Sequence, residues 1–419
     1  MVLLFAFWFL MGRARSWRGN PRELCDALHQ PGRLLVNLTS PLHTQWRPLD
    51  EKGCAPLPAY LPALWTLTHG EDRLPPQYQA SIFSKEYRQV AAEPLSETDA
   101  PRSRLDPIPF LRKRRAHPPT VLVVGDSVDR NGLVHFCQLF RRNVSIALYH
   151  DINDYPPGPY PPDLTRGHGP KYKGWDQRGL LHRCEIPFAN GDGVALRVIN
   201  GFHYGMDALD EFNSPDHNDW HAPGRIERRI DELFVPAIKQ LGGTDKVDVV
   251  QLHSGMWDLA LFGMQDDKTR WSLTIPLTPE QLAWWQDRMR HTIGHLRKTF
   301  PRARLVFRKL HRTDDAVQGT QYITNCETPL GFCHLARARV LTLGFLSCSL
   351  RHLQEEVARS EGLPIFDFGH VLEGYQAFQE KVHPLLVPGG IVYAHNLVNQ
   401  LRIALESKDS WRRGWLWDD

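Results

Sequence analysis

The feature that most constrains the fold is a short apolar run that passes directly into a polar, helix-forming segment. Residues 120–124 (Thr-Val-Leu-Val-Val) are continuously apolar after the first position and rich in β-branched residues, which is typical of a strand buried on both faces of a sheet. Apolar runs similar to residues 120–124 predict further strands at residues 144–149, 194–200, 247–252, 304–308 and 365–368. The turn Asn-Gly-Asp-Gly at residues 190–193 lies between two apolar stretches and predicts a hairpin.

Helical patterns separate these predicted strands. The clearest begins at Thr278, where Thr-Pro-Glu-Gln forms a capping box with proline at the first helical position, and it continues with apolar residues at helical spacing until Pro301. A last helix is expected over residues 391–405. Strands that alternate with helices predict an α/β fold, a three-layer α/β/α domain with a mainly parallel sheet. We place this domain at residues 118–407.

The ends of the chain are organised differently. Residues 1–19 begin with an apolar run followed by arginines, which predicts a signal or anchor segment; a signal peptide, a clipped signal anchor and a misplaced start remain alternatives. Residues 20–117 are predicted to form a loop-rich N-terminal lobe and a polar linker, and residues 408–419 an aromatic-basic tail. No run approaches the roughly 18 apolar residues of a spanning helix, which excludes a multi-pass membrane protein.

The compartment follows from weak but concordant features. Asn-x-Ser/Thr sequons begin at Asn37 and Asn143, and together with the apolar N-terminus they predict entry into the secretory pathway, with a secreted or Golgi-membrane location and a possible N-terminal membrane anchor. The 50 Lys and Arg residues against 47 Asp and Glu residues leave a net charge of +3, which argues against a nucleic-acid partner.

Seven cysteines agree with an oxidising compartment. The spacing would allow Cys25 to pair with Cys54, and Cys326 with Cys333, in local disulfides. Metal ligation is the competing interpretation, and the lack of any Cys-x-x-Cys pair argues against it.

Candidate catalytic residues follow the predicted strands, because ligands of open α/β sheets bind beyond the carboxyl ends of the strands. After the first strand, Gly-Asp-Ser leads into a helix, so Ser127 would have an exposed hydroxyl and an amide at a helix N-terminus, where a developing oxyanion is stabilised. A helix-capping serine is an equally weighted alternative. Near the C-terminus, His383 follows Glu380 by three residues, so the imidazole could act on a serine while the carboxylate holds its tautomer.

Two further strand ends add candidates. Gly201 follows the predicted strand at residues 194–200, and its lack of a side chain would let a backbone N–H approach a substrate oxygen; an ordinary turn glycine is the alternative. Gly-Met-Trp-Asp at residues 255–258 places an indole donor and a carboxylate after another strand, with core packing as the alternative for Trp257.

In this order the motifs resemble those of the SGNH or GDSL-type hydrolase superfamily. More narrowly, Gly-Asp-Ser-x-x-Arg at residues 125–130 with Gly-x-Trp-Asp at residues 255–258 is similar to the PC-esterase group, which includes the trichome-birefringence-like proteins. The resemblance covers about residues 120–405. The region between Cys25 and Cys54 also resembles the small N-terminal lobe of plant members.

The resemblance implies serine acyl transfer on O-acylated carbohydrate, by an acetylesterase or an O-acetyltransferase that needs no cofactor. Ser127 would be the nucleophile and His383 the general base, with the amides of Ser127 and Gly201 binding the oxyanion. The family usually has Asp where this chain has Glu380, so Glu380, Asp367 or no carboxylate at all would orient the imidazole.

The same resemblance assigns the remaining site residues. Trp257 stands where many hydrolases have an Asn donor, and its indole N–H or the Arg130 guanidinium would substitute. Asp126, Gly255 and Asp258 would support the site. The partners would be an acylated glycan or another ester, and an acyl donor if the enzyme is a transferase.

Two rival interpretations stay open. Residues 216–221 (Asp-His-Asn-Asp-Trp-His) place several metal-ligand types together, but flanking prolines favour a hydrated surface loop, and we predict no metal site. The alternative function is a catalytically inactive SGNH-fold module that binds glycan or serves as a scaffold.

Overall fold

The computed structural model describes most of the predicted α/β domain and part of the N-terminal region. Glu380, the predicted signal or anchor at 1–19, the rival metal-ligand segment at 216–221 and the predicted Cys326–Cys333 pair lie outside the described residues. Within the described part, no helix is both long and apolar enough to cross a membrane. The described residues are 25–37, 40–70, 107–113, 115–148, 180–206, 208, 224–266, 277–311, 349–372, 378–379 and 382–414.

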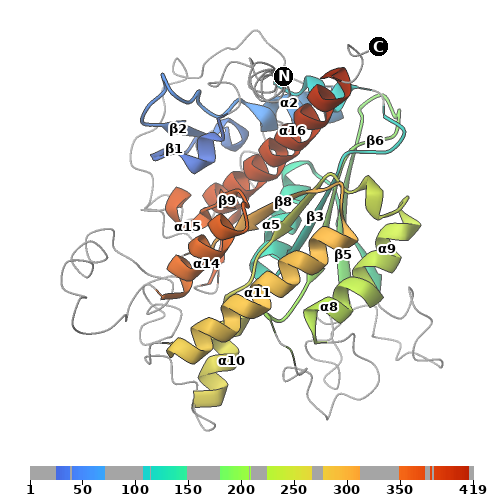
Figure 1. Ribbon diagram of the computed structural model, residues 1–419. Helices are drawn as coiled ribbons and strands as arrows, with labels where there is room; N and C mark the ends of the chain where they lie inside the picture. The colour runs from blue at the N-terminus through green and yellow to red at the C-terminus, as the bar shows by residue number, and fades with distance from the viewer. Residues whose placement is uncertain are drawn as a thin grey trace, which may run out of the picture.

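A seven-stranded sheet forms the centre of the molecule, with the strand order β4-β5-β6-β3-β7-β8-β9 (Figure 1). The five strands from β6 to β9 run parallel, and β5 and β4 extend one edge with antiparallel pairing. The mainly parallel α/β fold predicted from the sequence is therefore confirmed. The strands are β3 (Thr120–Gly125), β4 (Ser145–Leu148), β5 (Leu180–Pro187), β6 (Val194–Phe202), β7 (Val249–Leu252), β8 (Arg304–Arg308) and β9 (Ile365–Phe366).

Strand β3 shows why the sheet has two cores. All its residues are buried. Val121 and Val123 belong to one hydrophobic cluster, whereas Leu122 and Val124 belong to the other, because successive side chains of a strand point to opposite faces. The central position of this continuously apolar strand is what its sequence predicts.

Helices cover both faces of the sheet (Figure 1). One face is covered by α5 (Ser127–Leu139), α16 (Ile391–Gly414) and α2 (Tyr60–His69), which lies beside α16. The other is covered by α8 (Ile226–Arg229), η8 (Ile230–Phe234), α9 (Val235–Gln240), α10 (Met256–Asp266), α11 (Pro279–Thr299) and α14 (Ser349–Ser360). Shorter elements are η1 (Ala27–His29), β1 (Gly32–Leu35), η2 (Pro41–His43), β2 (Gln45–Pro48), α4 (Pro109–Arg112), η9 (Thr244–Lys246), α15 (Phe368–Val371), β10 (Phe378–Gln379), β11 (His383–Pro384) and η10 (Leu386–Gly390).

Local sequence signals set several boundaries as expected. Thr278 caps α11 through a capping box, in which its hydroxyl accepts from the Gln281 amide and the Gln281 side chain accepts from the Thr278 amide. Gly191 and Gly193 adopt positive φ values in the predicted turn between β5 and β6. Helix α16 continues to Gly414, so the beginning of the predicted tail at residue 408 is helical.

The predicted hairpin implied a strand before residue 190, but the bounds of strand β5 were not predicted. In this strand Cys184 and Ile186 are buried, whereas Arg183 and Glu185 are partly exposed. This is the alternation of a strand that is apolar on one side only, and the search for continuously apolar runs passes over it.

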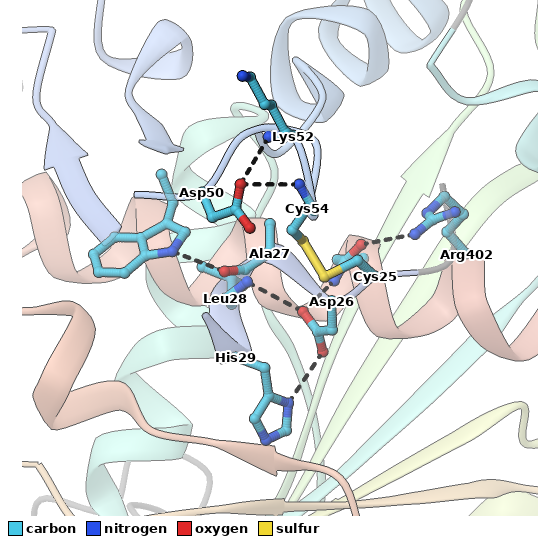
Figure 2. The surroundings of a disulfide bond; sticks show 12 residues. Cys25, Asp26, Ala27, Leu28, His29, Asp50, Lys52, Cys54 and Arg402 are labelled. Atoms are coloured by element: carbon cyan, nitrogen blue, oxygen red, sulfur yellow. Dashed lines mark hydrogen bonds and ion pairs between the residues drawn. A yellow bond between two sulfur atoms is a disulfide. The ribbon is translucent and has the colours of Figure 1, made fainter. Parts of the chain in front are cut away.

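The N-terminal segment is held by the predicted Cys25–Cys54 disulfide, which the structure confirms (Figure 2). Beside it the Trp46 indole donates to the carbonyl of Ala27 at 2.8 Å. Asp26 accepts hydrogen bonds from two side chains of α16, Asn399 at 2.9 Å and Gln400 at 2.7 Å. Residues 25–70 share the hydrophobic cluster of α5 and α16, and the predicted boundary at residue 118 stays a prediction.

A second disulfide, Cys137–Cys184, joins α5 to β5. Its cysteines are 47 residues apart and belong to two different elements, so no local spacing indicates it. Disulfides persist in oxidising compartments, and two of them are consistent with an extracytoplasmic protein.

Candidate active site

The structure brings together Ser127 and His383, which are 256 residues apart in the sequence. Ser127 is the first residue of α5, directly after the carboxyl end of β3. His383 lies in β11, which pairs with β10 just before η10 and α16. The distance between His383 Nε2 and Ser127 Oγ is 2.8 Å, and both side chains are half-buried.

Asp126, not Ser127, caps the helix. The Asp126 carboxylate accepts from the Val128 amide at 2.9 Å, and the Asp126 amide donates to the Asp129 carboxylate at 3.3 Å, which completes a capping box. The alternative interpretation of Ser127 as a cap is therefore not realised. Its hydroxyl faces the imidazole, and its amide belongs to the first helical turn, whose N–H groups have no acceptor within the helix.

A buried ion pair between Arg308 and Asp129 holds the first turn of α5 in place. Arg308, the last residue of β8, binds both carboxylate oxygens of Asp129 at 2.8 Å, and the Tyr393 hydroxyl donates to the same carboxylate at 2.8 Å. Burial alone would lower the pKa of Arg308, but the Asp129 carboxylate raises it above its ordinary value, so the guanidinium stays charged. Arg308 and Asp129 are fully buried.

The capping carboxylate is held by a second pair. Asp126 lies 3.2 Å from Nε2 of His253, which follows β7, and 3.6 Å from the Arg308 guanidinium. Burial alone would raise the pKa of Asp126, but the neighbouring His253, the Arg308 guanidinium and the Val128 amide hold it well below its ordinary value. His253 Nδ1 donates to the Arg308 carbonyl at 2.9 Å. Asp126 is thus an ionised cap that is anchored on two neighbouring strands.

The same carboxylates and imidazole are close enough to one another to ligate a metal ion. However, Arg308 binds Asp129 through two nitrogens and also lies beside Asp126, so a guanidinium already supplies the positive charge between them. The residues present fit an internal ion-pair cluster and not a metal centre.

The two candidate substitutes for an Asn donor contact the same aromatic ring. This ring belongs to Phe202, and the two candidates beside it are Arg130 and Trp257. The Arg130 guanidinium, on α5, lies 5.9 Å from the centre of the Phe202 ring at the end of β6. Trp257, on α10, contacts Phe202 edge to face with ring centres 6.5 Å apart, and Tyr204 in the same way at 4.7 Å. Trp257 is half-buried, so part of the indole remains accessible beside this cluster.

The sequence predicted that Gly201 follows its strand, and this prediction is wrong, because Gly201 lies within the strand. Strand β6 continues to Phe202, and Gly201 pairs inside the sheet with Val124 on one side and Leu181 on the other. A Cβ at this position would overlap the Phe234 ring at 2.6 Å. The glycine is required for close packing of η8 on the sheet, because any side chain would displace that ring.

Asp258 and Gly255 serve the packing of α10. The Asp258 carboxylate accepts from the Met206 amide at 2.6 Å, the Ser254 hydroxyl at 2.5 Å and the Trp285 indole at 2.9 Å. Burial raises the pKa of Asp258 even with these donors. Gly255 lies against the Leu310 side chain, which a Cβ would meet at 2.7 Å. Asp258 therefore joins α10 to residues that follow β6 and β7 and to α11, and its support of the catalytic site stays a prediction.

Asp367, an alternative partner for His383, is engaged elsewhere. Its carboxylate binds Arg351 at 2.8 Å and Lys309 at 3.0 Å, and it accepts from the His370 amide at 3.1 Å. Burial alone would raise the pKa of Asp367, but the two cations lower it to about 2. The carboxylate therefore holds α14 and the residue after β8 together.

Another histidine lies near the pair. Burial, together with the charge of His383, lowers the pKa of His135 on α5 to about 4. His135 is therefore neutral at physiological pH and adds no positive charge beside His383.

Most residues of the buried ion-pair cluster around Asp126 and Asp129 were not predicted from the sequence. Asp129 occupies the third helical position after the Asp126 cap, which is a capping-box position that the sequence displays. Arg308 and His253 lie at the ends of predicted strands, where polar residues were sought, but nothing local indicates that they meet Asp129 and Asp126. In the sequence pattern, Tyr393 is indistinguishable from the other apolar residues of the last helix.

No family model matches the chain, and no curated protein matches it. The solved structures to which it is similar include a GDSL-like lipase from Parabacteroides merdae ATCC 43184, with 11% identity and a TM-score of 0.30 over 69% of this chain and 96% of that one. They also include a peptidoglycan O-acetylesterase, with 11% identity and a TM-score of 0.32 over 71% of this chain and 94% of that one. At these values the similarity does not extend to a function.

Proposed function

We propose that this chain is a serine-dependent acyl-transfer enzyme in which Ser127 is the nucleophile and His383 the general base. The observation that supports this proposal is the 2.8 Å contact between Ser127 Oγ and His383 Nε2 at the carboxyl edge of the parallel sheet. A nucleophile within hydrogen-bond reach of its base is the geometry that such catalysis requires.

The contact supports a two-step reaction. In the first step His383 Nε2 takes the Ser127 proton as Oγ attacks the ester carbonyl carbon, and it then gives that proton to the departing alcohol oxygen. An acyl-serine remains. In the second step water or a sugar hydroxyl loses its proton to the same nitrogen and attacks the acyl carbon, which releases Ser127 with its proton restored.

The N-terminus of α5 would stabilise the transition state. The oxyanion would accept from the backbone amide of Ser127 at the first helical position, where the positive end of the helix dipole also favours negative charge. Asp126 and Asp129 lie close by, but their charges face inward toward His253 and Arg308. This pairing limits the repulsion that two carboxylates would otherwise exert on an oxyanion.

We further propose an O-acylated carbohydrate as the substrate, with an acetylesterase or an O-acetyltransferase reaction. Two features support this choice: the resemblance of the motifs to the PC-esterase group, and the half-buried Trp257 in the Phe202–Tyr204 cluster. Amphipathic aromatic rings offer a flat face to a sugar ring, and Arg130 would supply hydrogen bonds to its substituents. Another ester remains the alternative substrate.

The compartment proposed for this reaction is the secretory pathway. The two disulfides support an oxidising environment. Asn143, which begins one of the sequons, is exposed between α5 and the edge strand β4, where a glycan would meet no obstruction from the core.

The first experiment measures labelling of the purified protein by a fluorophosphonate probe, which reacts with activated serines. We expect labelling of the wild type, none of Ser127→Ala, and wild-type labelling of Ser360→Ala, a control at the exposed end of α14. His383→Ala should slow labelling by at least about a hundredfold, because a positioned general base contributes that much or more.

A companion variant tests whether Glu380 is the carboxylate that orients His383. Glu380→Gln should slow labelling if Glu380 orients His383, and leave it unchanged if no carboxylate is used. A folded wild type that neither reacts with the probe nor hydrolyses p-nitrophenyl acetate would contradict the enzyme proposal. It would favour the inactive glycan-binding module instead.

A further inference from the structure

His311 supports the loop that carries His383. It follows β8, is fully buried, and its Nε2 donates to the carbonyl of Val382 at 2.8 Å. Val382 directly precedes His383 in the chain. Because a carbonyl only accepts, the proton of the neutral imidazole lies on Nε2.

The protonation state of His311 is fixed by its surroundings. Burial is the main reason that its pKa falls to about 3, and the nearby Arg308 charge lowers it further. Its Nδ1 has no hydrogen-bond partner within the described part of the chain. A buried imidazole with one unpaired nitrogen costs free energy relative to an apolar residue, so its presence calls for a gain elsewhere.

Within the described residues, the segment that holds His383 forms a very short ladder. Strands β10 and β11 pair over two residues each, Gln379 with His383 and Phe378 with Pro384. The His311 ring packs against Phe378 of this ladder, with ring centres 6.3 Å apart. The bond to Val382 adds an anchor from the central sheet at the residue next to the proposed base.

The other end of that anchor is rigid. The Leu310 amide donates to the Gln354 side chain at 2.9 Å, and the Leu310 carbonyl accepts from Arg351 at 2.6 Å, so α14 fixes the backbone just before His311. Arg308, three residues earlier, holds Asp129 in the first turn of α5. The end of β8 therefore contacts both sides of the Ser127–His383 pair.

We propose that His311 is a positioning residue that sets the distance and orientation of His383 toward Ser127 through the Val382 carbonyl. This inference rests on the proposed function. It predicts that loss of the Nε2 donor slows acyl transfer without weakening substrate binding, because a misplacement of about 1 Å in a catalytic pair can cost on the order of a hundredfold in rate.

The chain offers a matched control in His395 on α16. This residue is also buried, its Nε2 donates to a backbone carbonyl, that of Thr44, at 2.9 Å, and its Nδ1 likewise has no partner in the described residues. Burial is again the main reason that its pKa falls, here to about 4. The carbonyl that it binds belongs to the N-terminal segment, not to the loop of His383.

The experiment compares His311→Gln, His311→Asn and His395→Gln with the wild type. A glutamine amide reaches about as far as Nε2 and can restore the bond to Val382, whereas the shorter asparagine cannot. We expect His311→Asn to lower kcat for p-nitrophenyl acetate and the fluorophosphonate labelling rate by at least about tenfold, with KM nearly unchanged and a changed pH–rate profile. His311→Gln should recover most of the rate, and His395→Gln should keep the wild-type kcat and profile.

Equal rates and pH profiles for His311→Asn, His311→Gln and the wild type would overturn the positioning role, and so would an equal loss in His311→Asn and His395→Gln. Ser127→Ala separates this failure from that of the proposed function, because activity that survives in Ser127→Ala overturns the role of Ser127 as the nucleophile. If His311→Asn does not fold, His311→Phe, which fills the site but has no donor, takes its place. A folded His311→Phe with the same rate and pH profile as His311→Gln contradicts the inference, whereas a loss of at least about tenfold that His311→Gln recovers supports it.

Discussion

At the scale of single residues, the consecutive pair Asp126 and Ser127 divides two tasks. Asp126 caps α5 and turns its charge inward to His253, while Ser127 directs its hydroxyl to His383. Arg308 at the end of β8 donates two hydrogen bonds to the Asp129 carboxylate, and both side chains are fully buried. The position of the proposed nucleophile thus depends on a buried ionic contact with a distant strand.

Replacement of Arg308 by methionine is expected to destabilise the protein strongly. The change leaves the buried Asp129 without its counter-ion, and breaking a buried pair in this way typically costs about 3 to 5 kcal/mol. Urea unfolding measures the loss. Arg228→Met serves as the control, because Arg228 binds Glu232 on the surface of the α8–η8 segment and should cost less than about 1 kcal/mol. Equal stabilities for the two variants would contradict the importance of the buried pair.

At the scale of secondary-structure elements, α5 is the piece that carries the site. Its N-terminus follows β3 and contacts β8 through Asp129, and its last turn is tied to β5 by the Cys137–Cys184 disulfide. Strand β5 runs antiparallel to β6, and the edge strand β4 runs antiparallel to β5, so the covalent bond joins the helix of the site to the part of the sheet added beyond the parallel strands.

The double variant Cys137→Ala/Cys184→Ala should unfold at a lower urea concentration than the wild type. The disulfide restricts the unfolded chain, and loss of such a bond typically costs about 2 to 5 kcal/mol. Peptide mapping without reduction should recover the two cysteines in one linked peptide pair. Free thiols at both positions in the wild type purified without reductant, together with an unchanged unfolding midpoint in the variant, would show that the bond is not formed.

At the scale of the whole molecule, several buried histidines stay neutral in the fold. Burial is the main reason that the pKa values of His182 and His395 fall to about 4, and that of His311 to about 3. In the unfolded chain each would titrate near its ordinary value of about 6.5. The unfolded state therefore binds more protons than the folded state between about pH 6.5 and pH 4, and acid favours unfolding in this window.

The free energy of unfolding should accordingly fall as the pH is lowered from 7 to 5, by up to about 2 kcal/mol for each such histidine. Full stability from these groups is present above pH 6.5, and the loss levels off below their folded pKa values. The depressed pKa values of Asp126 and Asp367 act in the same direction but only below about pH 4. Urea titrations at several pH values measure the slope, and His395→Phe should flatten it; an unchanged slope in that variant would contradict the assignment.

The sequence by itself determined the elements whose signals are local. The continuously apolar β3, the capping box of α11 and the turn at residues 190–193 are each specified by a few neighbouring residues. Strand β8 has an apolar run between two arginines, and Cys25 and Cys54 lie 29 residues apart in one N-terminal segment. Ser127 was predicted because ligands of α/β sheets bind at strand ends, and His383 because it follows Glu380 by three residues before the last helix.

Only the tertiary structure decided which distant residues meet. The Cys137–Cys184 bond, the Arg308–Asp129 pair and the His311–Val382 contact each join segments from separate elements, and no local spacing records them. The position of Gly201 within β6 was decided by the Phe234 ring that packs on it. A local sequence pattern reflects backbone preference and burial, whereas the partners of buried charges and imidazoles are set by how strands and helices stack in three dimensions.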